Sequence, residues 1–106
     1  MTHSMVLGIG AKHSLTFYCG ELPADAAVFA AQHEPNGYFW EAVAIFVAPE
    51  IAGRLELESE DGMFSASGSK EDCDALQARI EPLLSSADSI GEVIASADET
   101  GFQFDE

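Results

Sequence analysis

The chain of 106 residues is short of basic side chains: it has four Lys and Arg against 19 Asp and Glu, for a formal net charge of −15. A field of this sign repels phosphates and anionic lipid headgroups, so nucleic acids and membranes are unsuitable partners. A basic protein is a suitable one, because opposite potentials accelerate its encounter. Solubility explains the charge equally well, and composition leaves the two interpretations open.

Cysteine and histidine are also scarce. Cys19 and Cys73 form no Cys-x-x-Cys pair, and we expect two small buried side chains in a reducing cytosol. None of His3, His13 and His33 lies three or four residues from another histidine or from a cysteine, whereas zinc requires several convergent ligands. We therefore expect no metal and no cofactor.

Long apolar runs and catalytic motifs are missing as well. The first residues show neither a basic leader nor a stretch of 18 apolar residues, so we expect no signal peptide, no transmembrane helix and a cytoplasmic location. There is no Gly-x-Ser-x-Gly motif, and Gly8-Ile9-Gly10 lacks the third glycine of a phosphate loop. We predict that the protein is not an enzyme and has no catalytic residues.

Apolar residues are plentiful, at 47% of the chain, which indicates one domain over residues 1–106 with a real core. Their spacing predicts strands and helices in alternating pairs. Strands are expected over 5–9, 14–19, 54–58 and 63–67, and helices over 25–32, 39–48, from 70 and from 90. The predicted class is α+β: a small antiparallel sheet of about four strands in two hairpins, with helices on one face, in the order ββααββαα.

Several local signals add detail to this plan. Asn36-Gly37 predicts a turn before the second helix. Pro82 is expected to kink or restart the third helix, and Ser89-Ile90-Gly91-Glu92 is expected to cap the fourth. Residues 101–106 are expected either to add a short edge strand or to stay loose.

Three consecutive aromatic residues open the second predicted helix. Helical geometry separates neighbours by about 100°, so Tyr38, Phe39 and Trp40 cannot form one stacked face. Trp40 shares a stripe with Val43 and is expected to anchor the core. Tyr38 is expected to keep its hydroxyl group in water. The cluster is predicted to be a structural helix entry rather than a ligand site.

The predicted second hairpin carries four acids within six residues, Glu56-Leu57-Glu58-Ser59-Glu60-Asp61. Glu56 and Glu58 share one strand face, about 7 Å apart. Catalytic carboxylates need a pocket that separates their pKa values, which an open strand face does not provide. The acids are therefore either a solvated outer face or a surface for Lys and Arg of a partner.

The stretch from Asn36 to Ala44, NGYFWEAVA, followed about twenty residues later by Glu60-Asp61-Gly62-Met63-Phe64, resembles the immunity protein 51 family. These are bacterial proteins thought to neutralise secreted polymorphic toxins. The resemblance extends from about residue 33 to a Phe-x-Phe-Asp tail ending at Asp105. Its structural motif consists of Asn36, Gly37, Trp40, Gly62, Met63 and Phe64. Two positions depart from the family pattern: Phe39 replaces a residue that is often acidic, and Pro35 one that is often glycine.

The resemblance implies binding and inhibition of a cognate toxin, and the acidic charge of the chain favours a basic, nuclease-like effector as that toxin. The expected toxin-binding residues are Glu56, Glu58, Glu60, Asp61, Tyr38, Glu41 and Glu34. A generic acidic adaptor or regulatory module is the first alternative, and a small carboxylate-dependent hydrolase is the second. A monomer is expected, or a weak homodimer formed through an edge strand near the N-terminus.

Overall fold

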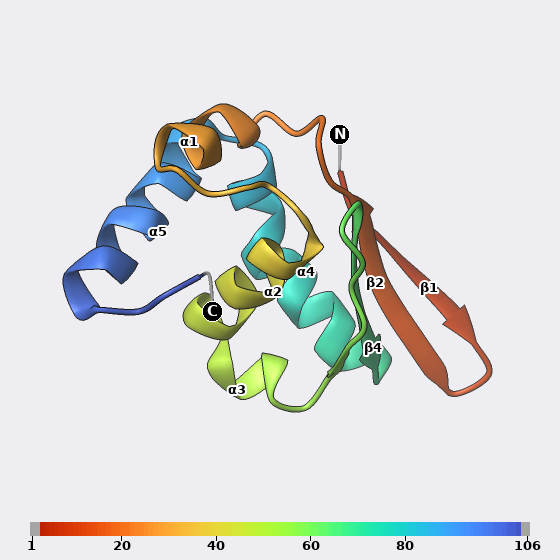
Figure 1. The fold of residues 1–106 in the computed structure, drawn as a ribbon. Coiled ribbons are helices and arrows are strands. Elements are labelled where there is room, and N and C mark those ends of the chain that lie inside the picture. Colours follow the sequence, from red (N-terminus) through yellow and green to blue (C-terminus); the bar gives the residue numbers. More distant parts are fainter. Residues whose placement is uncertain (1–2, 105–106) are drawn as a thin grey trace.

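Residues 3–104 are described by the structure, a computed structural model, except for the side chain of Ile9. This part of the chain confirms the predicted α+β class and the order ββααββαα, with one additional short helix (Figure 1). The elements are β1 (Met5–Ile9), β2 (Lys12–Tyr18), α1 (Asp25–Ala30), α2 (Gly37–Val47), α3 (Pro49–Ala52), β3 (Glu56–Leu57), β4 (Met63–Gly68), α4 (Lys70–Leu84) and α5 (Ala87–Thr100).

The four strands form one antiparallel sheet in the order β1-β2-β4-β3. The two hairpins, β1–β2 and β3–β4, are joined at the centre of the sheet by the pairing of β2 with β4. Strand β2 shows the cause of this layering: Leu15 and Phe17 are buried, while Ser14 and Thr16 point to the other face. Strand β3 is shorter than predicted, because Arg54 and Leu55 continue the turn that follows α3.

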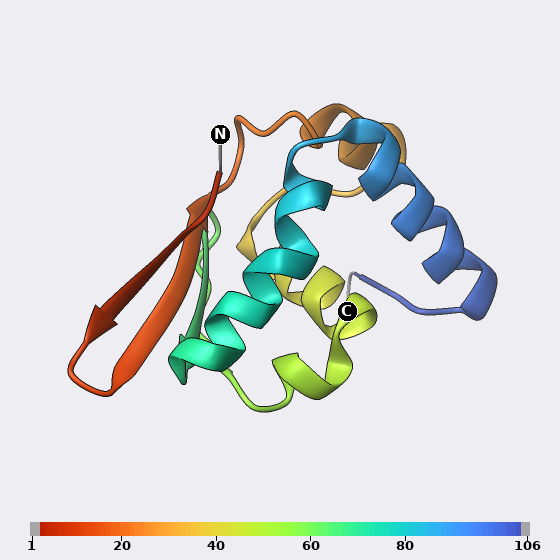
Figure 2. The ribbon, with the colours of Figure 1, turned by 180° about the vertical axis from the view of Figure 1, so that it is seen from behind.

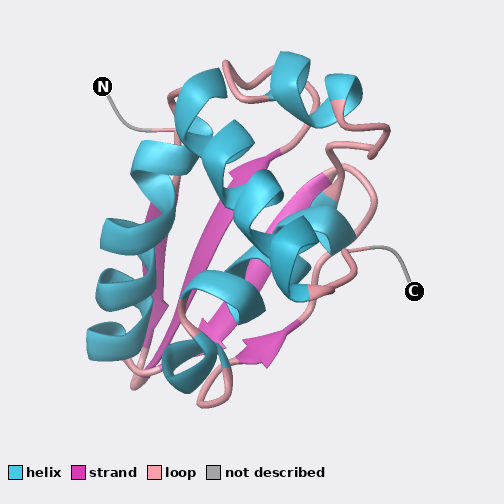
Figure 3. Cartoon of the chain, turned by 90° about the vertical axis from the view of Figure 1, so that its left-hand side faces the viewer, coloured by secondary structure: helices cyan, strands magenta, loops and turns pink. Residues whose placement is uncertain are grey.

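All helices lie on one side of the sheet, and the opposite face is open (Figures 1 and 2). Helix α4 runs along β1 and β2, α2 packs against β4, and α5 lies farther out (Figure 3). Trp40 is fully buried between these layers, as predicted, with its ring edge-on to Phe17 at 5.7 Å. Phe17 in turn stacks on Phe64 at 4.8 Å, so the strands and α2 share one aromatic core.

The segment after α5 packs against α2 instead of forming an edge strand or staying loose. The helix ends at Gly101, whose φ of +82° suits glycine, and the chain turns back. The Phe102 ring lies 5.0 Å from that of Phe46, and the Phe104 ring lies 5.1 Å from that of Phe39. The prediction failed because burial of two aromatic rings does not require regular structure. The Asp105 position of the tail motif lies outside the described residues.

The helices differ from the predictions in three places. Helix α4 does not restart at Pro82 but continues to Leu84, whose side chain is fully buried. Helix α5 is capped by Ser86, which has extended backbone and accepts a hydrogen bond from Ser89 N at 3.2 Å, so Ser89 lies inside the helix. The chain bends at Asn36 as predicted, but Asn36 is also the cap of α2, so the helix begins at Gly37 rather than at residue 39.

The N-terminal segment is fastened to α4 by the Glu81 carboxylate. Glu81 accepts hydrogen bonds from the backbone N–H groups of His3 at 2.8 Å and Ser4 at 3.2 Å, and from the Ser4 hydroxyl at 2.5 Å. Burial raises the pKa of Glu81, but these hydrogen bonds outweigh burial and hold the pKa below its ordinary value of 4.5. The charged carboxylate therefore stabilises the fold.

We expect Glu81→Gln to lower the free energy of unfolding by about 2 kcal/mol at pH 7, because one of the two oxygens that accept from His3 N and Ser4 N becomes a donor. The folded pKa is depressed, so the wild-type contribution is present above pH 4.5 and is lost as the pH falls through the folded pKa. Urea unfolding at pH 7 and pH 3 should show the difference between variant and wild type shrinking in acid. Glu92→Gln, at an exposed site, is the control. An equal loss at both pH values would contradict this account.

Candidate functional site

The acidic hairpin, residues 56–63, is fixed in place by the first turns of α2. Gly37 N donates to Asp61 O at 3.1 Å, and the Glu41 carboxylate accepts from Ser59 N at 2.9 Å. Asn36 starts the helix by accepting from Phe39 N at 2.8 Å. We call this contact between α2 and the hairpin the joint. Because the joint uses both main-chain and side-chain bonds, the hairpin acids are displayed on a rigid support.

Gly37 is required at the joint because of space rather than conformation. A Cβ atom there would lie 2.1 Å from Glu60 O, 2.6 Å from Met63 O and 2.9 Å from Ser59 Cβ. Two of these atoms are backbone, so no side-chain rotation relieves the overlap. The sequence pattern showed Gly37 only as a turn signal, and its close approach to the hairpin was not predicted.

The joint brings together most residues of the predicted structural motif. Asn36 caps α2 and Gly37 is its first residue, while Gly62 belongs to the hairpin loop and Met63 and Phe64 begin β4. Gly62 O also accepts from Cys19 N at 2.9 Å, which ties the hairpin loop to the end of β2. The two motif halves, about twenty residues apart in the chain, therefore meet in space.

All four predicted hairpin acids are exposed to solvent: Glu56, Glu58, Glu60 and Asp61. Glu56 Oε1 lies 3.4 Å from Lys12 Nζ, and Glu58 Oε1 accepts from the Ser67 hydroxyl at 3.1 Å. In the described part of the chain, no basic side chain forms an ion pair with Glu58, Glu60 or Asp61. These three carboxylates are available to an external cation.

Every Lys and Arg side chain of the protein is already engaged by one of its own carboxylates. The pairs are Lys12–Glu56 at 3.4 Å, Arg54–Asp72 at 3.0 Å, Lys70–Asp74 at 2.6 Å and Arg79–Glu50 at 3.9 Å. The four pairs neutralise four of the 19 acids, and within residues 3–104 no other acid forms an ion pair with a Lys or Arg side chain. The strong negative field is thus a property of the folded surface as well as of the composition.

Of the other predicted binding residues, Glu34 shares a cavity with one hairpin acid, whereas Tyr38 and Glu41 lie at a separate hollow. Glu34 lines a cavity of about 270 Å³ together with Asp61. Tyr38 is 56% exposed, as predicted, and lines a separate hollow with Glu41 beside the C-terminal segment. One carboxylate oxygen of Glu41 accepts the hydrogen bond from Ser59 N at the joint, so this side chain helps to hold the hairpin in place. Phe39 occupies the position that is often acidic in the immunity protein 51 pattern. Its side chain is 2% exposed and faces the aromatic core.

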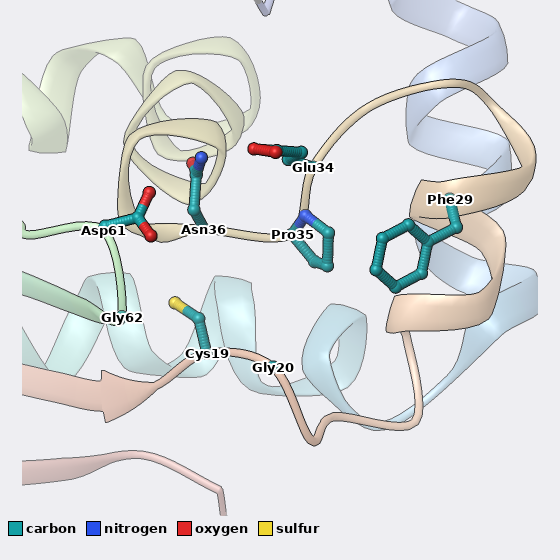
Figure 4. A pocket seen from close by; sticks show the side chains of 8 residues that line it. All are labelled: Cys19, Gly20, Phe29, Glu34, Pro35, Asn36, Asp61 and Gly62. Carbon is teal, nitrogen blue, oxygen red and sulfur yellow. The ribbon is translucent and has the colours of Figure 1, made fainter.

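Figure 4 shows the cavity beside the hairpin loop, with the Cys19 sulfur directed toward Asn36 and Asp61 and the Phe29 ring facing Pro35. Burial raises the pKa of Cys19 to about 11, and the negative charges of Asp25 and Asp61 contribute to the increase. The thiol is therefore protonated at neutral pH and is a poor nucleophile. Acids and a neutral thiol around a small hollow give this cavity no catalytic constellation.

The open face of the sheet was not singled out by sequence reasoning, although alternation in the strands carried the signal. A groove of about 480 Å³ lies there, lined by Leu7, Lys12, Ser14, Thr16, Glu58, Ser65 and Ser67. Hydroxyl groups occupy its centre, because the same alternation that buries Leu15 and Phe17 turns Ser14 and Thr16 outward. One predicted hairpin acid, Glu58, thus borders a feature that reaches across the sheet.

Within residues 3–104, no group of three or more His, Cys, Asp or Glu side chains is arranged to hold a metal ion. None of the helices in the same range is long and apolar enough to cross a membrane. The fold and surface together define an acidic α+β domain with a rigidly supported hairpin. Comparison with protein-family models, with curated proteins and with solved structures finds no match to the chain.

Proposed function

We propose that this protein is an immunity protein that binds a basic, nuclease-like toxin and inhibits it through the acidic hairpin. The observation that carries the proposal is the distribution of charge. All four Lys and Arg side chains are paired internally, while Glu58, Glu60 and Asp61 stand exposed on a hairpin fixed by the joint.

Rigid support makes these carboxylates effective ligands for Lys and Arg. A preorganised group loses little conformational freedom on binding, so more of the interaction energy appears as affinity. Carboxylates also resemble the phosphates that a nuclease binds, so a hairpin seated in such an active site would occupy the substrate position. The molecule measures 40 × 27 × 21 Å, and its broad faces can supply the roughly 800 Å² that a stable interface needs.

The resemblance to the immunity protein 51 family supports the same function. The two motif halves that carry it meet at the joint, so their spacing in the sequence serves to present the hairpin. An inhibitor of a toxin that acts inside the cell must also be present there, and we place the protein in the cytoplasm on this ground. A generic acidic adaptor would bind a partner without blocking an activity.

The protein encoded by the adjacent open reading frame is the partner to test. We expect it to be basic, to bind in stopped-flow measurements, and to lose its toxic activity on binding. The association rate should fall at least about tenfold between about 20 and 300 mM NaCl, because opposite fields steer the encounter. An acidic neighbour, binding without inhibition, or an association rate indifferent to salt would overturn the proposal.

A further inference from the structure

The open face of the sheet is organised in three bands. Met5 and Leu7 of β1 form an apolar edge, with 47% and 54% of their surfaces exposed. Hydroxyl groups fill the centre, where Ser14 pairs with Ser67 and Thr16 pairs with Ser65 across β2 and β4. The carboxylates of Glu56 and Glu58 form the opposite edge.

Two hydroxyl groups of the central band form a short hydrogen-bond chain that ends on a carboxylate. Ser14 Oγ lies 3.0 Å from Ser67 Oγ, and Ser67 Oγ donates to Glu58 Oε1 at 3.1 Å. Ser67 is only 3% exposed, so the chain is held between its neighbours. Ser14, Ser67 and Glu58 all line the groove of about 480 Å³. A carboxylate beside hydroxyl oxygens in one groove selects for a ligand with several donors.

A cation of the protein itself already lies in this groove. Lys12 lines it, and Lys12 Nζ is 3.4 Å from Glu56 Oε1. Both side chains are largely exposed, so the pair is weak and readily exchanged for a better one. The position of Lys12 indicates that the groove accepts positive charge. Lys12 pairs with Glu56 only, so Glu58 can bind a second cation.

We propose that the groove receives an arginine side chain of the basic partner. This inference rests on the proposed function and adds a second contact to the one that the acidic hairpin makes with the partner. A guanidinium group is planar and offers five donors, which suit a carboxylate beside a row of hydroxyls. The arginine methylene groups would pack along Leu7. A second copy of this chain is a poorer occupant, because each copy carries a net charge of −15.

The test uses acetyl-arginine amide as the probe and acetyl-citrulline amide, its neutral isostere, as the control. Two-dimensional amide NMR of the full chain should show saturable shifts at Ser14, Thr16, Ser65 and Ser67 with the arginine compound only. Glu58→Gln should weaken binding of the probe about fivefold or more. Glu99→Gln, which removes one charge on an exposed site of α5, should change it less than twofold.

Substitution of the resident lysine supplies a test in the opposite direction. Lys12→Gln should strengthen probe binding severalfold, since it frees Glu56. Lys70→Gln changes the net charge by the same amount but frees Asp74 on α4, so it should have little effect on the groove shifts. Equal effects of the two lysine variants, or equal shifts with citrulline, would overturn the inference.

The outcome also separates this inference from the proposed function. Shifts confined to Glu60 and Asp61, with none in the groove, would remove the arginine site and leave the acidic hairpin as the contact. Salt-insensitive association with the neighbouring protein would remove the proposed function, whatever the probe does.

Discussion

Gly37→Ala is expected to lower the free energy of unfolding by about 3 kcal/mol, the upper end of the usual cost of overpacking. The new methyl group would overlap the carbonyl oxygens of Glu60 and Met63, which lie 2.1 and 2.6 Å from its position. Relief requires the acidic hairpin to move away from α2, which would also stretch the hydrogen bond from Gly37 N to Asp61 O. Urea unfolding followed by circular dichroism measures the loss.

A matched control exists at Gly91, which lies inside α5 and has open space around the position that an added methyl group would take. Gly91→Ala should stabilise the protein by about 0.5–1 kcal/mol, because alanine favours helix over glycine. The same chemical change is thus expected to have opposite signs at the two sites. Similar effects at both positions would contradict the close contact at the joint.

Reversing the charge of all four hairpin acids is expected to weaken toxin binding at least about a hundredfold. The variant combines Glu56→Lys, Glu58→Lys, Glu60→Lys and Asp61→Lys, all at exposed positions. Attractive pairs become repulsive ones, and close charge pairs across interfaces are coupled by about 1.5–7 kcal/mol. The side chains are outside the core, so the far-ultraviolet circular dichroism spectrum should be unchanged. Calorimetric titration with the neighbouring protein measures the effect.

The control for this variant makes the same change in net charge at a distance from the hairpin. Four exposed acids serve: Glu21, Glu92, Asp98 and Glu99. Their reversal should reduce the association rate through the weaker overall field but leave the dissociation rate nearly unchanged. Undiminished affinity of the hairpin variant would show that the hairpin is not the binding surface. Equal losses of affinity in both variants would show that the hairpin contributes only through the overall charge.

Much of the fold was predictable because its signals are local. The alternation around Leu15 and Phe17 specified β2 and its buried face, and the helix expected from residue 70 begins there as α4, capped by Ser69. The apolar stripe that includes Trp40 and Val43 identified the buried face of α2. Each of these patterns reports burial of one face of one element, which neighbouring residues determine among themselves.

Features that depend on contacts between distant segments were missed. Nothing near Gly37 in the sequence reveals that hairpin carbonyls lie against it. The aromatic docking of Phe102 and Phe104 depends on α2, and the extension of α4 past Pro82 depends on the buried Leu84. The hairpin acids were found by charge density alone, whereas the groove needed the pairing of β2 with β4 to place its hydroxyl groups side by side.

The order of the strands has a consequence for synthesis on the ribosome. Strand β2 pairs with β1 and β4, and β4, which ends at Gly68, is synthesised about fifty residues after β2. The aromatic core also includes Phe104, which packs on Phe39 and is synthesised later still. The native core is therefore complete only after nearly all of the described chain has left the exit tunnel.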